Sequence, residues 1–381
     1  MYHIVIIGTG IAGYTLAREF RRLNTEKSVL LITSDDGANY SKPTLSNALG
    51  QNKTPEQLIM SDATTMAETL QSEIRTHATV ERIDTEARKV WLQDNDTIEY
   101  ENLVLAVGAA PIRIPINGDG ASNVLSINNL ADYRIFREKL DSAQTIALSG
   151  PGLIGCEFAN DLLNADKQVH IIGPDQYALS SLLPEVVGTE LQEKLQEAGV
   201  QWHLQTTIAK IDKQAQGYQV SLNNGKQLRV DLVLSAVGLR PDIQLAKQAG
   251  LEVNRGIVAN TQLQTSANNV YALGDCVEVN GQNLLYIMPL MNGAKALAKT
   301  LIGEPTAVKY PTMPVSVKTP LYPLTILPPS RDAQGNWQVE KTENSLIARF
   351  ESDNGKLLGF VLAQDAAKKR MAYIKEVSEQ N

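Results

Sequence analysis

Twice along this chain, an unbroken run of apolar residues ends in glycine and continues into a helical pattern of apolar positions. The first run is His3–Ile7, which is short and β-branched and therefore predicts a strand buried on both faces. Gly8–Gly13 follows with the spacing G-x-G-x-x-G, and apolar residues then recur at helical spacing as far as Phe20. This pattern is typical of a strand, a tight turn and a helix that together bind a dinucleotide.

Each glycine of this turn has its own task in such a motif. Gly8 allows the tight turn, Gly10 lets a pyrophosphate approach the backbone, and Gly13 lets the helix pack against the strand. The unpaired N–H groups at the start of the helix are expected to face the phosphates, and the helix dipole favours an anion there. One such motif is weak evidence, because any tight strand-to-helix turn favours glycine.

The chain repeats the same arrangement in its second third. Thr145–Ser149 predicts a strand, Gly150–Gly155 carries the same glycine spacing, and the following helix is predicted to run through Leu163. Because both motifs lie between a strand and a helix, the sequence predicts an α/β protein with two Rossmann-like dinucleotide-binding domains.

Three further apolar runs end at a glycine. Buried strands predicted at 103–107 and 232–237 lead to Gly108 and Gly238, which suggests two related domains with the chain crossing between them. A shorter strand leads to Gly274 and Asp275, where the backbone can approach a ligand and a carboxylate can accept sugar hydroxyls. A role for Asp275 as a helix N-cap is the alternative at this position.

The composition of the sequence changes after Tyr310, where prolines separate short stretches that are predicted to be extended. We expect an antiparallel sheet closed by a helix over 365–377, which makes a C-terminal α+β domain. The expected domains are a first dinucleotide-binding domain of residues 1–111 and 241–310, a second dinucleotide-binding domain of residues 112–240, and the C-terminal domain of residues 311–381. Smaller strands are predicted at 74–80 and 82–91, and an inserted sheet at 201–211, 218–222 and 228–230.

An acidic residue is expected about 20 residues after each glycine turn, where it would hold a ribose hydroxyl. In the first unit Asp35 lies at this place, next to Thr33 and Ser34, and loop formation explains Asp35 equally well. In the second unit Asp175 follows Gly173, and a ribose contact and a β-turn role both remain open. The absence of a neighbouring arginine favours NADH over NADPH.

Three charged residues are candidates for tuning a cofactor. Lys42 lies in a polar, proline-marked loop that is expected to open a helix, and an ordinary surface lysine is the alternative reading. Glu157 lies in the first turn of the second motif's helix, either facing solvent or facing a cleft, where it would need a cation such as Lys42. Lys318 is expected at the end of a strand.

Composition and charge narrow the class of protein. A net charge of -7 with scattered signs makes nucleic acid an unexpected partner, and no apolar run reaches the roughly 18 residues of a membrane span. The first strand begins at once, so we expect no signal peptide and a cytoplasmic protein. Two cysteines, Cys156 and Cys276, and four scattered histidines predict no disulfide framework, metal site or iron–sulfur site.

The stretches GTGIAG, LVLAVGA, GPGLIGCE, VGLRPD and TSANNVYALGDC, in this order, resemble the flavoprotein reductases with two dinucleotide domains, FAD first and NAD(P)H second. Within that family, NYSKPTLS and MPVSVKTPLYPL resemble the bacterial rubredoxin reductases that serve alkane hydroxylation. The resemblance covers nearly the whole chain and implies an NADH-dependent FAD oxidoreductase whose partner is rubredoxin.

The resemblance also implies site residues. The residues implied around FAD are Gly8, Gly10, Ile11, Ala12 and Gly13 at the pyrophosphate, Thr33, Ser34, Thr79 and Val80 at the adenosine, Asp275 at the ribityl and pyrophosphate region, and Ile287 at the flavin. Gly108 and Gly274 are further candidates for cofactor binding. The residues implied around NADH are Gly150, Gly152, Ile154, Gly155, Glu157 and Gly238. Lys42 is implied beside the flavin ring with Glu157 as its ion-pair partner, and Lys318 is implied near the pyrimidine end of the ring.

The residues that are missing point to the electron acceptor. Disulfide reductases and peroxidases of this fold pass electrons to cysteines beside the flavin, and this chain has no cysteine near Lys42. Electrons are therefore expected to leave the protein, and the resemblance implies that they pass singly to the iron of rubredoxin. We expect Lys42 and Lys318 to stabilise the negative charge of the reduced flavin. The alternatives are a ferredoxin or flavorubredoxin reductase, a membrane-bound quinone reductase, and an NADH-sensing protein without turnover.

Overall fold

The computed structural model describes residues 1–330 and 332–380 of the 381-residue chain. Its contacts divide the chain into two compact units. The first unit consists of Met1–Ser41, Gln57–Ala110 and Leu239–Tyr310, and the second of Lys42–Glu56, Pro111–Gly238 and Pro311–Asn381. This grouping joins the short segment 42–56 and the C-terminal segment to the predicted NAD-binding region, so the division into three domains stays a prediction.

The first unit is built on a seven-stranded sheet in the order β5-β2-β1-β8-β7-β6, with β19 also paired to β8. The strands β5, β2, β1, β8 and β19 are parallel to their neighbours, and β7 and β6 are antiparallel. The strands are β1 (Tyr2–Ile7), β2 (Val29–Ile32), β5 (Glu73–Arg75), β6 (Val80–Asp84), β7 (Lys89–Leu92), β8 (Thr97–Leu105) and β19 (Val270–Ala272). The apolar runs of β1 and β2 are buried because helices cover the sheet, as their sequence predicts.

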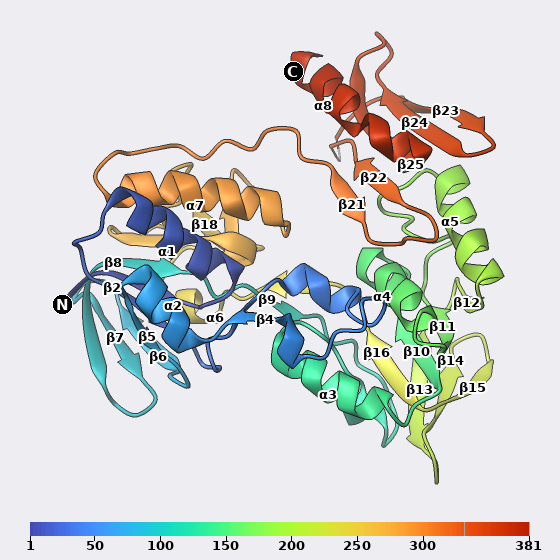
Figure 1. Ribbon diagram of the computed structural model, residues 1–381, viewed down its shortest axis with the longest axis horizontal. Helices are drawn as coiled ribbons and strands as arrows, with labels where there is room; N and C mark the ends of the chain where they lie inside the picture. Colours follow the sequence, from blue (N-terminus) through green and yellow to red (C-terminus); the bar gives the residue numbers. More distant parts are fainter. Residues whose placement is uncertain (331, 381) are drawn as a thin grey trace. The chain divides into compact units, whose positions relative to one another are not determined.

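Two helices from opposite ends of this unit's sequence lie side by side. Helix α1 (Ile11–Leu23) follows β1 directly, and α7 (Ile287–Leu301) packs along it (Figure 1). Both bury an apolar face that includes Leu16 of α1 and Leu297 of α7. The remaining elements are β3 (Asn39–Tyr40), β4 (Ile59–Ser61), α2 (Ala63–Leu70), α6 (Gln244–Gln248), β18 (Ile257–Ala259), β20 (Val277–Val279) and the short 3₁₀ helices η2 (Glu56–Leu58) and η4 (Gly274–Cys276).

The second unit repeats the parallel arrangement with four strands in the order β12-β11-β10-β16. These are β12 (Val200–His203), β11 (Gln168–Ile172), β10 (Thr145–Ser149) and β16 (Leu232–Ser235). The strand order matches β5-β2-β1-β8 of the first unit, so the duplicated glycine motif belongs to a duplicated sheet. Our assignment of residues 201–203 to an inserted sheet was wrong, because β12 pairs in parallel with β11 and completes this sheet.

The inserted sheet itself is smaller and antiparallel. It consists of β13 (Ile208–Lys213), β14 (Tyr218–Leu222) and β15 (Gln227–Val230). Helices α3 (Leu130–Leu140), α4 (Leu153–Leu163) and α5 (Glu185–Glu197), with η1 (Lys42–Ser46) and η3 (Ala121–Asn123), complete this part of the unit. The short strands β9 (Ala109–Pro111) and β17 (Leu239–Pro241), where the chain passes from one unit to the other, pair with each other.

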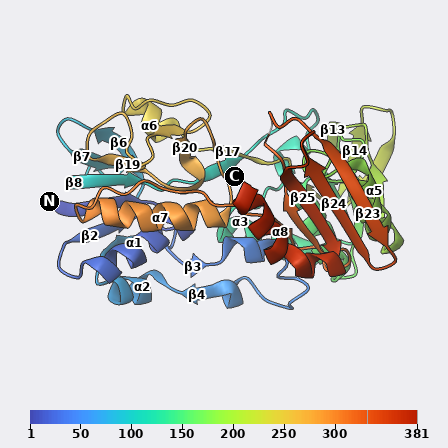
Figure 2. The same ribbon diagram turned by 90° about the horizontal axis from the view of Figure 1, so that it is seen from above.

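The C-terminal segment forms an antiparallel sheet, as the sequence predicts, and this sheet has five strands, of which β23, β24 and β25 are labelled in Figure 2. Its strands are β21 (Val315–Val317), β22 (Leu324–Leu327), β25 (Leu357–Gln364), β24 (Ser345–Glu351) and β23 (Asn336–Thr342). The predicted closing helix is split into η5 (Asp365–Lys369) and α8 (Arg370–Gln380), and Val377 of α8 packs on a core that contains Phe360 and Leu362 of β25. Lys318 directly follows β21, as expected.

One predicted strand is two strands in the structure. Residues 82–91 contain the end of β6, a turn and the start of β7. The Asp84 carboxylate accepts hydrogen bonds from the backbone N–H groups of Glu86 and Ala87, and Arg88 adopts a positive φ of 54°. The turn contains neither glycine nor proline, so the usual sequence marker of a turn is missing here.

Candidate functional site

The first glycine turn has the shape of a phosphate cradle. A Cβ atom at Gly8 would lie 2.3 Å from the Ala106 carbonyl oxygen, and one at Gly13 would lie 1.9 Å from the Gly8 carbonyl oxygen. These two glycines therefore allow backbone to pack on backbone. A Cβ at Gly10, in contrast, would meet no atom within 4 Å. Gly10 faces open space, which is where a pyrophosphate needs to approach.

The start of helix α1 is suited to an anion. Gly10 is its N-cap and supplies no side-chain hydrogen bond to the first turn, and that turn contains no acidic residue. The N–H groups at Ile11 and Ala12 belong to the set that a helix leaves without an internal partner. Together with the helix dipole they favour a phosphate at this end, so the residues present fit the predicted FAD pyrophosphate.

The second glycine turn reproduces this geometry. A Cβ at Gly150 would lie 2.6 Å from the Ala236 carbonyl oxygen, and one at Gly155 would lie 1.9 Å from the Gly150 carbonyl oxygen. Gly152 is the uncapped N-cap of α4, and a Cβ there would meet nothing within 4 Å. Ile154 in the first helical turn is 42% exposed. The predicted NADH contact at Ile154 thus lies on the exposed side of the helix start.

A second pair of glycines extends the duplication. Two residues after Ala106 and Ala236, respectively, come Gly108 with a φ of 74° and Gly238 with a φ of 109°. Both are in the left-handed region, which non-glycine residues rarely adopt. A Cβ at Gly108 would meet no atom within 4 Å, and one at Gly238 would meet only Ile112, at 3.7 Å. The first unit thus has a second glycine turn after strand β8, and the second unit has one after strand β16.

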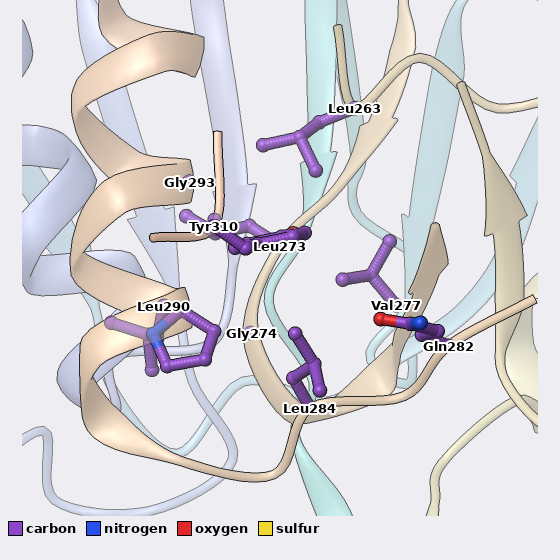
Figure 3. A pocket seen from close by; sticks show the side chains of 10 residues that line it. Leu263, Leu273, Gly274, Val277, Gln282, Leu284, Leu290, Gly293 and Tyr310 are labelled. Atoms are coloured by element: carbon purple, nitrogen blue, oxygen red, sulfur yellow. The ribbon is translucent and has the colours of Figure 1, made fainter. Parts of the chain in front are cut away.

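The Gly274–Asp275 turn lies against the first cradle, although it is remote in sequence. A Cβ at Gly274, which has a φ of 85°, would lie 2.9 Å from Cβ of Ala12 in α1. Figure 3 shows Gly274 in the lining of a pocket, with Leu290 of α7 also in this lining. Asp275 is therefore held near the start of α1. It lies inside η4, whose N-cap is Leu273, so the N-cap alternative for Asp275 was wrong.

Helix α7 begins with exposed apolar side chains. Tyr286, Ile287 and Met288 are 40%, 38% and 53% exposed, respectively. No side chain caps the helix here. The predicted flavin contact at Ile287 thus lies at an open, apolar helix start.

The residues predicted to lie at the adenosine are brought together by backbone hydrogen bonds. The Thr33 N–H donates to Arg75, and the Ala78 N–H donates to Thr33, at 2.9 and 2.8 Å. Thr33 and Ser34 therefore lie beside the segment that leads to Thr79. The Asp35 carboxylate accepts from the Thr33 hydroxyl at 2.6 Å and from the Gly37 N–H at 2.9 Å. This arrangement supports the reading of Asp35 as a loop former.

Glu157 is the centre of a buried polar cluster in the second unit. Its side chain is 1% exposed. It accepts hydrogen bonds from the Ser46 hydroxyl at 2.6 Å and from the Lys318 N–H at 2.9 Å, and it forms an ion pair with the Lys318 ammonium. The same ammonium donates to Ser46 Oγ at 2.8 Å. The buried carboxylate is thus fully hydrogen-bonded, as burial of a charge requires.

The expected ion pair between Glu157 and Lys42 was wrong. The Lys42 ammonium donates to Asn128 Oδ1 at 2.7 Å, and the cation paired with Glu157 is Lys318. Lys42 opens the 3₁₀ helix η1, which then carries Ser46 to Glu157. Nothing in the sequence indicated Lys318 as the ion-pair partner of Glu157, because Lys318 lies far away in the C-terminal segment.

Two further buried polar residues of α4 were not predicted from the sequence. Asp161 is 2% exposed and accepts hydrogen bonds from the N–H groups of Leu49 and Gly50 at 3.0 and 2.7 Å. Asn160 is 1% exposed and accepts from the Leu321 N–H at 3.3 Å. Burial raises the pKa of Asp161 above its ordinary value. The signal was present as three polar residues on an otherwise apolar helix.

Both cysteines are inert in this fold. Cys156 and Cys276 are fully buried, and their thiols lie in hydrogen-bond contact with backbone carbonyl oxygens. Burial raises the pKa of the Cys276 thiol to about 11 and also raises that of Cys156. A nucleophilic or redox-active thiolate is not favoured at either position. The described residues contain no group of His, Cys, Asp and Glu side chains placed to bind a metal.

Two models of known protein families match this chain. Residues 2–297 match the family model of pyridine nucleotide-disulphide oxidoreductases. The chain belongs to this family. Residues 307–377 match a second model, that of the rubredoxin-binding C-terminal domain. The predicted fold, with two dinucleotide-binding regions and a C-terminal α+β segment, is confirmed.

Relatives match over the full length of the chain. A rubredoxin-NAD(+) reductase of Acinetobacter baylyi is 48% identical, with 100% of this chain and 98% of that protein covered. A nitric oxide reductase FlRd-NAD(+) reductase of Aliivibrio fischeri is 37% identical, with 99% of both covered. The structure of an NADH:rubredoxin oxidoreductase from Clostridium acetobutylicum has a TM-score of 0.83 at 19% identity, covers 100% of this chain and 96% of that one, and supports the fold.

The predicted enzyme class and cofactors are confirmed by this membership. The protein is an oxidoreductase that uses FAD and NADH. The glycine turns leave open backbone at Gly10 and Gly152, as a bound pyrophosphate requires. Among the helices of residues 1–330 and 332–380, none combines the length and the apolar character needed to cross a bilayer.

Proposed function

We propose that this flavoprotein takes hydride from NADH and passes electrons singly to rubredoxin. The observation that carries the proposal is the combination of two open glycine cradles with a rubredoxin-binding C-terminal domain in one chain. The two buried thiols, whose raised pKa values disfavour thiolates, add a second argument, because they leave the flavin without a cysteine acceptor in the protein.

Different residues have different roles in this reaction. The first cradle and Asp275 hold FAD, the second cradle orients NADH, and the bound flavin supplies the hydride and electron chemistry. Lys42 and Lys318 act at the flavin ring by stabilising negative charge, a role carried over from the family resemblance. Glu157 is a positioning residue, because it holds the Lys318 ammonium and the Ser46 hydroxyl in one place.

A flavorubredoxin reductase is the second candidate. The 37% identity to the Aliivibrio fischeri protein over the whole chain favours it. The two candidates share the hydride half of the reaction and differ in the docking of the acceptor. Cytoplasmic localisation and service to alkane hydroxylation are further proposals, supported by the resemblance and by the 48% identical rubredoxin-NAD(+) reductase.

The proposal is tested by anaerobic bleaching of oxidised rubredoxin in the visible, started with NADH. Parallel reactions contain the rubredoxin domain of a flavorubredoxin, a ferredoxin, or NADPH in place of NADH. We expect fast NADH-dependent bleaching of rubredoxin. Reduction of ferricyanide without reduction of rubredoxin would retain the flavoprotein reductase and overturn the partner, and faster reduction of the flavorubredoxin domain would favour the second candidate.

A further inference from the structure

The end of strand β11 lacks the acid that dinucleotide-binding units place there to bind the ribose of NADH. The residue at the strand end is Gly173, and the structure shows why no side chain stands at it. A Cβ at Gly173 would lie 2.2 Å from Cδ and 2.6 Å from Cγ of Pro151. Pro151 lies inside the second glycine turn, so its ring occupies the space that a side chain at Gly173 would need.

A carboxylate nevertheless reaches this place from two residues further along. Oδ2 of Asp175 lies 3.4 Å from the position of a Cβ at Gly173. The other oxygen, Oδ1, accepts a hydrogen bond from the Ser180 hydroxyl. The backbone of the loop is fixed as well, since Gln205 N–H donates to the Asp175 carbonyl and Thr206 N–H donates to that of Gly173, both at 3.1 Å.

The turn-forming alternative for Asp175 lacks its usual signature. Asp35, which shapes a turn in the first unit, accepts from the backbone N–H of Gly37. In the part of the chain that the structure describes, no backbone N–H donates to the Asp175 carboxylate, whose hydrogen bond comes from the Ser180 hydroxyl. The Ser180 hydrogen bond fixes the orientation of the carboxylate, and the Asp175 residue is only half-buried.

We propose that the Asp175 carboxylate accepts a hydrogen bond from the 2′-hydroxyl of the adenosine ribose of NADH and makes this protein select NADH over NADPH. It replaces the strand-end acid that Pro151 excludes from position 173. A carboxylate at this point binds a hydroxyl and repels a 2′-phosphate dianion. The inference rests on the proposed function only in placing NADH at the second cradle, and it is independent of the electron acceptor.

The test is calorimetric titration of the FAD-loaded protein with NAD⁺, 2′-deoxy-NAD⁺ and NADP⁺. For the unaltered protein we expect NAD⁺ to bind about tenfold more tightly than 2′-deoxy-NAD⁺, the effect of one hydrogen bond to a charged group. Asp175→Ala should weaken NAD⁺ binding by about tenfold and leave binding of 2′-deoxy-NAD⁺ within about twofold. Asp175→Asn, which keeps the volume and removes the charge, should strengthen binding of NADP⁺.

The control is Asp141→Ala at the exposed end of α3, which should change none of these affinities. Equal weakening of NAD⁺ and 2′-deoxy-NAD⁺ by Asp175→Ala would overturn the proposal and assign Asp175 a role in loop structure. Unchanged NAD⁺ binding in both Asp175 variants would overturn it as well. Rubredoxin takes no part in these titrations, so a failed rubredoxin assay leaves their result intact.

Discussion

Glu157 and Lys318 form a buried ion pair across a sequence separation of 161 residues. The glutamate comes from the helix that starts at the second glycine turn, and the lysine comes from the end of a strand in the C-terminal segment. Ser46, at the end of the 3₁₀ helix η1 that begins at Lys42, forms hydrogen bonds with both residues of the pair. One hydrogen-bonded cluster therefore joins helix α4, the segment that begins at Lys42 and the C-terminal segment within the second unit.

Substitution Lys318→Met is expected to destabilise the protein because it leaves the Glu157 charge buried without its cation. Breaking a fully buried pair costs about 3–5 kcal/mol, and since the Lys318 side chain is 28% exposed, water compensates in part and we expect about 2 kcal/mol. The loss is measured as a fall of several degrees in the Tm of the FAD-loaded protein.

The matched control is Lys368→Met, which removes an 82% exposed lysine paired with Asp365 and should cost less than about 0.5 kcal/mol. The double variant Glu157→Gln with Lys318→Met should recover part of the lost stability, because no charge is then left buried. Equal Tm values for Lys318→Met and Lys368→Met would contradict the assigned role of the pair.

The two kinds of glycine in the first cradle should respond differently to alanine. Gly10→Ala places its methyl group in open space, so the fold should persist while FAD binding weakens by about tenfold or more, as expected when a backbone approach to phosphate is blocked. Gly13→Ala places a methyl group 1.9 Å from a carbonyl oxygen and should prevent folding. Circular dichroism and the FAD-to-protein absorbance ratio distinguish these outcomes.

Gly152→Ala transfers the same experiment to the second cradle. The purified variant should retain a full complement of FAD, since a Cβ at Gly152 meets no protein atom within 4 Å, and should bind NAD⁺ about tenfold more weakly. Flavin absorbance and NAD⁺ titration measure the two effects on one sample. A loss of FAD in Gly152→Ala with unchanged NAD⁺ affinity would assign the cradles to the opposite cofactors.

Asp161 is expected to anchor the segment of residues 42–56 to helix α4. Asp161→Ala removes the acceptor of two backbone N–H groups, each worth about 1.5–3 kcal/mol as a hydrogen bond to a charged group, and the expected loss is about 2–4 kcal/mol after partial access of water. Limited tryptic digestion should then cleave after Lys53 faster than in the unaltered protein. Asp141→Ala serves as the control, and an unchanged cleavage rate in Asp161→Ala would contradict the anchoring role.

The buried histidines predict a loss of stability in weak acid. Burial, with Lys226 and His170 close by, lowers the pKa of His203 to about 4, and Nε2 of His203 lies 3.0 Å from Nδ1 of His170. The unfolded chain binds this proton at about pH 6.5. The stabilisation is therefore present above about pH 6.5 and is lost as the pH falls toward 4.

His203→Gln should flatten the decrease in Tm between pH 6.5 and pH 4. Exposed His77, which has a φ of 52°, provides the control as His77→Asn, and this variant should keep the slope of the unaltered protein. A Tm profile of His203→Gln that runs parallel to that of the unaltered protein would show that His203 does not cause the acid sensitivity.

Local patterns in the sequence determined the two strand–turn–helix units and the tasks of their glycines. The reason is physical: Gly13 and Gly155 each pack on the carbonyl oxygen of a glycine five residues earlier, Gly8 and Gly150 respectively, so the G-x-G-x-x-G spacing encodes this contact directly. The position of Lys318 at a strand end and the antiparallel C-terminal sheet were accessible for the same reason, through alternation and proline placement.

The tertiary structure alone decided the pairings between distant segments. Whether Glu157 bonds to Lys42 or to Lys318 depends on which side chain folding brings to a buried carboxylate, and both lysines satisfy the charge. The missing acid at Gly173 has its cause in Pro151, which reaches it only through packing. The periodicity of apolar residues indicates on which face of a helix or strand a residue lies. Burial of charge, steric exclusion and the choice of hydrogen-bond partner are decided only when helices and strands pack against one another.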